Sequence, residues 1–233
     1  MTDSDSDPDT TDEELVAAIR EVGRVAHTHE TTATVRNDAA ALLREAAALL
    51  RDGPPRLRWY EVDEGHTDAT RARNRELSTF SGSLNPVAPP MAISTGTLED
   101  GRPALVGVVR LDRLREGPPR SAHGGVLAGL FDELLGGGQR LNGGPPGVTG
   151  RLTVRYRRPT PLGVDLRLRV WIHDERKRRV TVRGDCVVVG EDARPTAEAE
   201  AVFLRVDFEQ LGAMMRHGAD GTTDAPAPRT ADD

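Results

Sequence analysis

At 233 residues, the chain suits one domain with a full hydrophobic core, and because only 3% of its residues are aromatic, that core must consist mainly of Val, Leu and Ala. The sequence has no run of 18 apolar residues and no basic, apolar leader, so we expect neither a membrane-spanning helix nor a signal peptide. The single cysteine, Cys186, excludes an internal disulfide and is consistent with a cytoplasmic protein.

The net charge of −6 comes from the two ends of the sequence. Residues 1–14 hold seven acids and residues 217–233 hold four, whereas residues 15–216 hold 26 acids and 30 bases, a net charge of +4. A mildly basic body can attract a polyanionic small molecule. Nucleic-acid-binding proteins usually carry denser basic patches with interleaved aromatic residues, so we expect no nucleic acid partner, and we expect no membrane association. Residues 1–10 and 213–233 are polar and are expected to be disordered tails.

Two amphipathic helices are predicted in residues 11–90, which we interpret as a helical N-terminal extension and linker. The first covers residues 11–28, with Thr11 at the start of a capping box. The second covers residues 38–51, with Asn37 as its cap. We expect both helices to dock on the main body and the rest of the extension to be loop.

Residues 91–210 carry mainly strand patterns and form the predicted main domain. Short runs that are apolar throughout or alternate between apolar and polar residues are typical of strands. One helix, near residues 126–138, interrupts them. The order predicts an α+β fold in which an antiparallel sheet packs around one central helix. The predicted strands are residues 91–97, 104–111, 151–158, 164–172, 180–189 and 197–206.

The central helix carries an acid, Asp132, among apolar residues. At about 100° per residue, the apolar side chains form one stripe that must face the sheet: Val126, Leu127, Leu130 and Leu134, with Phe131 and Leu135 on its flank. Asp132 points away from that stripe, and Glu133 is expected to point to solvent. Small residues lie within about 60° of the acid on the same projection: Gly125, Ala128, Gly129 and Gly136. The helix therefore leaves a trough beside Asp132 that a ligand or another backbone could approach closely.

His123-Gly124-Gly125 lies where this helix should begin. Free backbone N–H groups and the helix dipole make such an end a place where the oxygen of a carbonyl can be polarised. Two other interpretations stay open for these residues: His123 as a capping residue bonded to backbone, and Asp132 as a solvated acid on an exposed face. The residues His27–Glu30 include two histidines, but they lie at the end of an exposed helix and we expect no metal site.

The segments "EGPPRSAHGGVLAGLFDELLG" and "GVTGRLTVRYRRPTPLG" resemble the hotdog-fold thioesterases of the phenylacetic-acid-degradation (PaaI-like) group, within the 4-hydroxybenzoyl-CoA thioesterase superfamily. The resemblance covers roughly Leu84–Asp207. It rests on HGG with an acid nine residues after the His, followed by a strand end of the form Y-[RK]-R-P-x-P-L-G. It implies a single hotdog domain, a homodimer or homotetramer with active sites at the subunit interface, and an acyl-CoA substrate with no metal and no redox cofactor.

The resemblance also implies roles for individual residues. Asp132 matches the catalytic acid, as general base or nucleophile. The backbone N–H of Gly125 matches the group that faces the thioester oxygen, with Gly124 beside it in contact with substrate, and His123 matches the motif histidine. Thr149 matches a residue that positions water near the acid, supplied by the opposite subunit. The coenzyme A phosphates are expected at Arg157 and Arg158, which could equally be arginines on the wet face of a strand.

One position departs from some relatives. They carry Asn or Gln six residues before the motif histidine, where this chain has Gly117. The sequence therefore predicts an acyl-CoA thioesterase that releases a carboxylic acid and CoA, and leaves open a second possibility, a hotdog dimer that binds acyl-CoA without hydrolysing it, as a sensor or carrier. Hotdog enoyl-CoA hydratases carry a His after the acid on the same helix, and no His follows Asp132 there.

Overall fold

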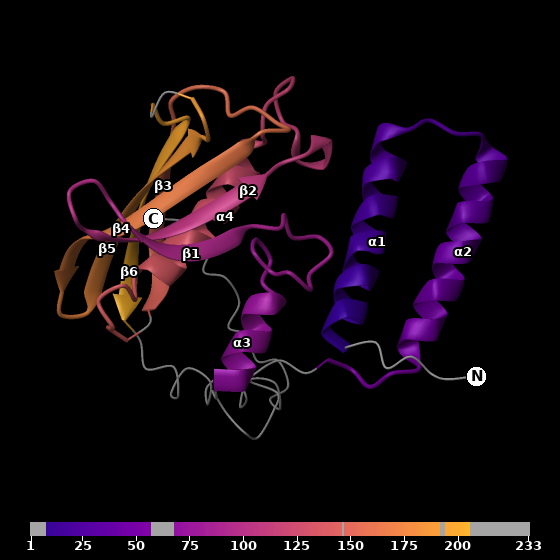
Figure 1. The fold of residues 1–233 in the computed structure, drawn as a ribbon, viewed down its shortest axis with the longest axis horizontal. Helices are drawn as coiled ribbons and strands as arrows, with labels where there is room; N and C mark the ends of the chain where they lie inside the picture. The colour runs from indigo at the N-terminus through magenta and orange to yellow at the C-terminus, as the bar shows by residue number, and fades with distance from the viewer. Residues whose placement is uncertain (1–7, 57–67, 146, 192–193, 206–233) are drawn as a thin grey trace, which may run out of the picture.

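The computed structural model describes residues 8–56, 68–145, 147–191 and 194–205, and the side chains of residues 8–10 and 68–71 are not described (Figure 1). The helices are α1 (Pro8–Thr28), α2 (Ala33–Arg51), α3 (Asp68–Glu76) and α4 (Gly124–Gly138), with a 3-10 turn, η1, at Arg113–Arg115. The strands are β1 (Ala92–Thr97), β2 (Pro103–Arg110), β3 (Gly147–Tyr156), β4 (Asp165–Arg176), β5 (Arg179–Val188) and β6 (Ala197–Arg205).

The six strands form one antiparallel sheet in the order β1-β2-β4-β5-β6-β3. The sheet curves around α4, which contacts β2, β3, β4, β5 and β6 (Figure 1). The expected α+β arrangement of an antiparallel sheet around one central helix is confirmed. Because β2 and β3 are not neighbours in the sheet, α4 carries the chain across its concave face, and Gln139 after the helix is hydrogen-bonded to Gly147 at the start of β3.

The core lies between α4 and the concave face of the sheet. The apolar stripe of the helix is buried as its periodicity predicts. The inward-facing residues of β2, β4, β5 and β6 complete the core, because side chains alternate between the two faces of a strand. At Gly138, a Cβ would lie 2.7 Å from Cγ2 of Val170, so a glycine is needed where the helix touches β4. The largest buried side chains of the helix are Leu127, Leu130, Phe131, Leu134 and Leu135.

Cys186 belongs to this core. Its side chain is fully buried on β5, and burial raises the pKa of its thiol from 9.0 to about 11. At pH 8 the thiolate fraction is on the order of one in a thousand, and the sulfur is out of reach of reagent. We expect no reaction of Cys186 with a disulfide reagent at pH 8 in the native protein, and one thiol per chain after denaturation. Rapid labelling of the native protein would show that β5 opens locally.

The N-terminal extension departs from its predicted boundaries. The first helix begins at Pro8, so Thr11 lies inside it and does not cap it. The second helix begins at Ala33, because the hydroxyl of Thr32 accepts a hydrogen bond from the N–H of Val35 and caps the helix in place of Asn37. The helix α3 lies in a region whose pattern predicts loop. Residues 8–10, predicted as part of a disordered tail, belong to α1, whereas residues 1–7 and 213–233 lie outside the described part of the chain.

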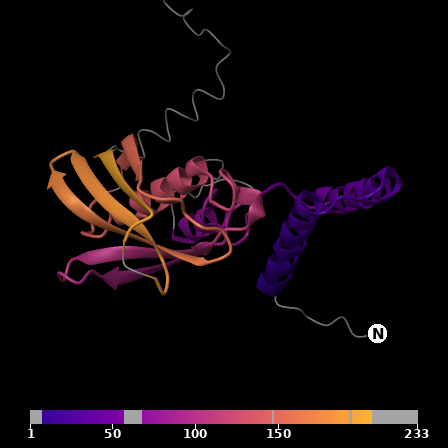
Figure 2. The same cartoon turned by 90° about the horizontal axis from the view of Figure 1, so that it is seen from above.

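Only one of the first two helices docks on the main body. Val16 of α1 is buried and α1 contacts η1, whereas α2 has no buried residue. Leu42 and Leu49 of α2 are 66% and 75% exposed. Figure 2 shows both helices on the side of the molecule away from the sheet. The expectation that both helices dock is therefore wrong for α2 among the described residues: its apolar stripe stays largely exposed.

Candidate functional site

Asp132 lies on the face of α4 that is turned away from the sheet, and its side chain is exposed. The hydroxyl of Thr149 donates a hydrogen bond to its carboxylate, with 3.1 Å between Oγ1 of Thr149 and Oδ1 of Asp132. Both residues belong to one chain. The expectation that an opposite subunit supplies this hydroxyl is therefore wrong for this contact: β3 of the same chain runs along α4 and brings Thr149 to the acid.

A β-bulge sets the direction of the Thr149 side chain. In the pairing of β3 with β6, Thr149 lies opposite Phe203 and Arg151 lies opposite Val202, so Gly150 is an extra residue. Strict alternation would place Thr149 on the outer face with Arg151. The extra residue reverses that phase, so Thr149 shares the inner face with the buried Phe203 and reaches Asp132.

The start of α4 is capped by His123. Its Nδ1 accepts a hydrogen bond of 3.0 Å from the N–H of Gly125, so the proton of the neutral ring is on Nε2. Of the two interpretations of His123, the structure thus shows the capping residue. The same bond corrects the assignment of Gly125, whose N–H is already engaged and does not face outward. Within the described residues, no acceptor pairs with the N–H of Gly124, so the free donor at this helix end is one residue earlier than expected.

Two neighbours hold the helix start in place. The hydroxyl of Tyr156, at the end of β3, donates to the carbonyl oxygen of Gly124 at 2.8 Å. At Gly117, a Cβ would lie 2.7 Å from the Cα of His123, so this loop has no room for the Asn or Gln that some relatives carry there. The backbone at position 117 therefore has no room for any side chain, so an Asn or Gln could not be restored there without moving the loop.

Gly124 and Asp132 of one chain are too far apart to serve one substrate carbonyl. They are eight residues apart on one helix, which corresponds to about 12 Å along the axis. A polarising N–H and a carboxylate that act on the same carbonyl must both lie within about 3–3.5 Å of the reacting atoms. One chain therefore presents two half-sites.

Residues outside the sequence motif also cover the face of α4 beside Asp132. Glu133 accepts hydrogen bonds from the hydroxyls of Ser78 and Ser81, the latter at 2.6 Å, so the expectation that Glu133 points to solvent is wrong. The ring of Phe80 lies over Gly129, filling part of the predicted trough. The sequence of this segment is typical of a loop. It lies about 50 residues before α4, and no local sequence pattern could predict that it packs on that helix.

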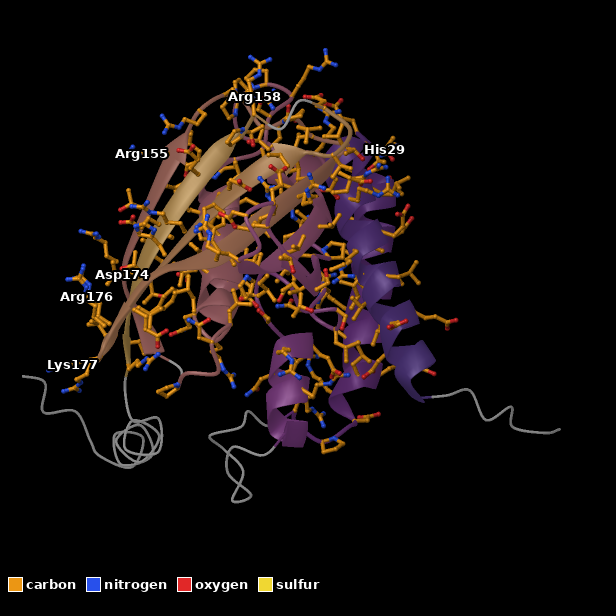
Figure 3. The ribbon with its side chains drawn as sticks, turned by 60° about the vertical axis from the view of Figure 1, so that its left-hand side comes forward. His29, Arg155, Arg158, Asp174, Arg176 and Lys177 are labelled. Atoms are coloured by element: carbon orange, nitrogen blue, oxygen red, sulfur yellow. The ribbon has the colours of Figure 1, made fainter. Side chains whose placement is uncertain are left out.

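The two arginines expected at the coenzyme A phosphates have partners within the chain. Arg157 donates two hydrogen bonds to one carboxylate oxygen of Glu198, at 2.9 and 2.6 Å. Arg158 donates to the carbonyl oxygen of Arg194 at 2.7 Å. Figure 3 shows Arg158 and Arg155 at the periphery of the molecule. The structure does not bring Arg157 and Arg158 to Asp132, and their role in phosphate binding stays a prediction.

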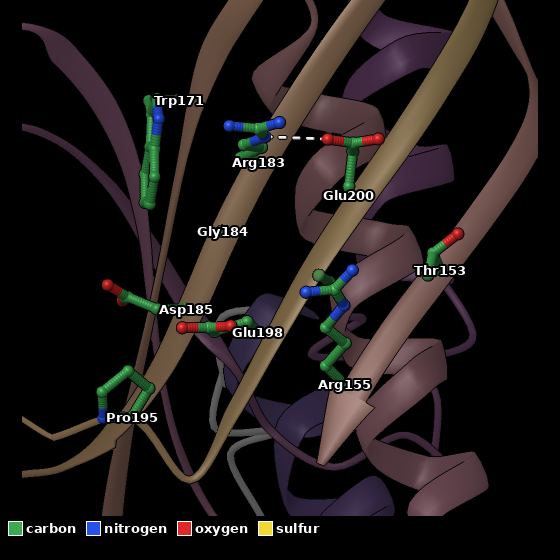
Figure 4. A pocket seen from close by; sticks show the side chains of 10 residues that line it. Thr153, Arg155, Trp171, Arg183, Gly184, Asp185, Pro195, Glu198 and Glu200 are labelled. Atoms are coloured by element: carbon green, nitrogen blue, oxygen red, sulfur yellow. Dashed lines mark hydrogen bonds and ion pairs between the residues drawn. The ribbon is translucent and has the colours of Figure 1, made fainter. Parts of the chain in front are cut away.

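A separate hollow of about 390 Å³ lies on the outer face of the sheet, opposite α4. Most of its charged side chains already have partners: Figure 4 shows Arg183 bonded to Glu200, and Asp185 accepts two hydrogen bonds from Arg169, which lies outside the hollow. This hollow is separated from Asp132 by the sheet and is not part of the candidate site.

None of the described helices is long and apolar enough to cross a membrane, and no group of three potential metal ligands occurs among the described side chains.

The fold and this helix define the class of protein. The sequence model described as "Thioesterase superfamily" matches residues 121–191, which include α4 and Asp132. A solved structure of a thioesterase superfamily protein is 30% identical, with a TM-score of 0.66, over 83% of this chain and 94% of that one. The chain belongs to the thioesterase superfamily and has its hotdog fold.

Other solved structures are more distant. The PaaI protein from the phenylacetic acid degradation operon of E. coli is 17% identical, with a TM-score of 0.43, over 49% of this chain and 80% of that one. A mutant of the phenylacetic acid degradation protein PaaI from Thermus thermophilus is 20% identical, with a TM-score of 0.41, over 49% of this chain and 94% of that one. None of the curated proteins compared with the chain matches it.

Proposed function

We propose that the protein is an acyl-CoA thioesterase that acts as a homodimer. The observation that carries this proposal is the pair of Asp132 and Thr149 on the exposed, side-chain-poor face of the central helix, in a member of the thioesterase superfamily. A carboxylate on a helix face that small residues surround is accessible to a substrate carbonyl and to water. The free N–H of Gly124 supports the same chemistry, because it can stabilise negative charge on a carbonyl oxygen.

The dimer follows from the distance between the two half-sites. Because Gly124 and Asp132 are about 12 Å apart along one helix, we propose that the helix start of one copy faces Asp132 of a second copy across a two-fold axis. Among the described residues, no strand pairs with the edge of β3 that faces away from β6, and β3 carries Thr149 and Tyr156. Pairing of two such edges would run the two sheets together and bring both half-sites to one interface.

Hydrolysis then needs few groups. As general base, Asp132 takes a proton from a water molecule that the Thr149 hydroxyl helps to position, and the water oxygen forms a bond with the thioester carbon. The carbonyl oxygen accepts negative charge beside the N–H of Gly124 in the second copy. The C–S bond breaks, the sulfur leaves as thiolate and takes up a proton, and the products are a carboxylic acid and CoA. As nucleophile, Asp132 would instead form an anhydride with the acyl group, which water then hydrolyses.

The test is release of free thiol from acyl-CoAs with short, medium, long and aryl acyl groups. We expect turnover with at least one class of acyl group by the purified full-length protein. If no acyl-CoA is hydrolysed and acyl-CoA still binds, the protein is the non-catalytic sensor or carrier, and the enzymatic proposal fails.

A further inference from the structure

The ring of Phe80 lies directly against the backbone of α4, one turn from Asp132. A Cβ built on Gly129 would be 2.1 Å from Cζ and 2.2 Å from Cε1 of Phe80, so the ring occupies the space that any side chain at position 129 would need. Residues three apart on a helix share a face, and Gly129 precedes Asp132 by three. Phe80 is therefore an apolar neighbour of the acid that comes from outside the helix.

The other glycines of this face are open. A Cβ at Gly125 would meet only the ring of His123, and a Cβ at Gly136 would meet nothing within 4 Å. Among these three glycines, Gly129 alone is covered by a distant segment. The trough beside Asp132 is thus closed at one place, by one aromatic side chain.

The segment that carries Phe80 is fastened to α4 on both sides of the ring. The hydroxyls of Ser78 and Ser81 both donate to Oε1 of Glu133, the residue next to Asp132. A charged acceptor strengthens such hydrogen bonds, and a partly buried carboxylate needs them. The ring therefore has a fixed position relative to the acid.

The N-terminal extension fastens the same segment from the other side. Arg20 of α1 donates to the carbonyl oxygens of Gly82, Ser83 and Asn85, at 3.2, 3.2 and 2.9 Å. Burial, with the nearby positive charge of Arg115, lowers the pKa of the Arg20 guanidinium, and the three carbonyls compensate for that desolvation. The extension is thereby connected to the face of α4 through Phe80.

We propose that Phe80 is the specificity-determining residue of the acyl site, an apolar wall beside Asp132 that restricts the substrate to short or compact acyl groups. This inference rests on the proposed function, since it concerns the acyl group of the same substrate. An acyl chain whose carbonyl carbon lies at Asp132 runs along the α4 face, where Phe80 both supplies apolar contact and blocks extension toward the helix start.

The test is the acyl-chain preference of Phe80→Ala. Each methylene that moves from water into apolar surroundings contributes a factor of about four. If about three methylenes occupy the vacated space, kcat/KM for long-chain relative to short-chain acyl-CoAs rises by roughly 50-fold over the wild-type ratio. Phe80→Trp is expected to shift the preference toward shorter chains. Leu84→Ala is the matched control: Leu84 belongs to the same segment but lines a cleft beside α1, so its loss should lower Tm without changing the chain-length ratio.

An unchanged chain-length ratio in folded Phe80→Ala would overturn the proposal. If Phe80→Ala does not fold, Phe80→Leu and Phe80→Trp decide in the same assay, because both keep an apolar side chain there. If the wild-type protein hydrolyses no acyl-CoA, the proposed function fails, and dissociation constants of the same acyl-CoAs for wild type and the Phe80 variants decide the role of Phe80. A shift of the preferred length supports the wall, and equal length profiles refute it.

Discussion

Replacing Asp132 by Asn should lower kcat for acyl-CoA hydrolysis by about a thousandfold while leaving the fold intact. Asn has the shape of Asp, and its amide oxygen can still accept the hydrogen bond from Thr149. It cannot take a proton from water and is a poor nucleophile, so the loss is expected whether the acid acts as base or as nucleophile. Because the side chain is exposed, Tm should change by little. Thiol release and thermal unfolding of the same preparation measure both quantities.

The control for this variant is Asp165→Asn. Asp165 is also an exposed acid, and it accepts a hydrogen bond of 2.8 Å from Arg110 at the β2–β4 pairing. The substitution changes the net charge by the same amount away from α4, and we expect wild-type kcat. If Asp132→Asn kept more than a tenth of the wild-type rate, Asp132 would not carry the reaction. The exposed-acid interpretation of Asp132 would then be the correct one.

The parts of this site that depend on local periodicity could be predicted from the sequence. The 3.6-residue period of α4 was enough to place Leu130 and Leu134 in the core and Asp132 on the opposite face. Short apolar runs and two-residue alternation likewise located each of the six strands to within a few residues. Both patterns arise because one face of a helix or strand is buried, so the choice of apolar or polar residue at each position shows which face it occupies.

Other features of the site have no such local signal. A single extra residue, Gly150, reverses the face that Thr149 occupies. The alternating pattern of residues 151–158 carries no sign of that reversal. A glycine within a strand pattern was the available clue. The contact of Phe80 with Gly129 joins residues 49 positions apart, and only the folded chain brings them together. The N–H of Gly124 is free because the ring of His123 pairs with the N–H of Gly125 instead, a detail of one side-chain rotamer.

Mixing two inactive variants should restore activity if each site uses Gly124 of one copy and Asp132 of the other. Gly124→Pro removes the free N–H and suits the helix start, because Gly124 is the first residue of α4, where Pro is well tolerated, and His123 before it has the extended backbone (φ −63°, ψ 132°) that precedes Pro. We expect it to lower kcat by a factor on the order of 10²–10³. Gly124→Ala is its control. It places a Cβ 3.2 Å from the hydroxyl oxygen of Tyr156, as Pro does, but keeps the N–H.

After Gly124→Pro and Asp132→Ala chains are unfolded and refolded together in equal amounts, half of the dimers contain one chain of each kind. Each mixed dimer has one site with both groups intact and one with neither, so about a quarter of the wild-type activity should return from two nearly inactive parents. Two different affinity tags isolate the mixed dimer, which should have half the wild-type rate. Mixed dimers that form and stay inactive would contradict a shared site. Since the two groups of one chain are about 12 Å apart along α4, the N–H of Gly124 would then have no part in hydrolysis at Asp132.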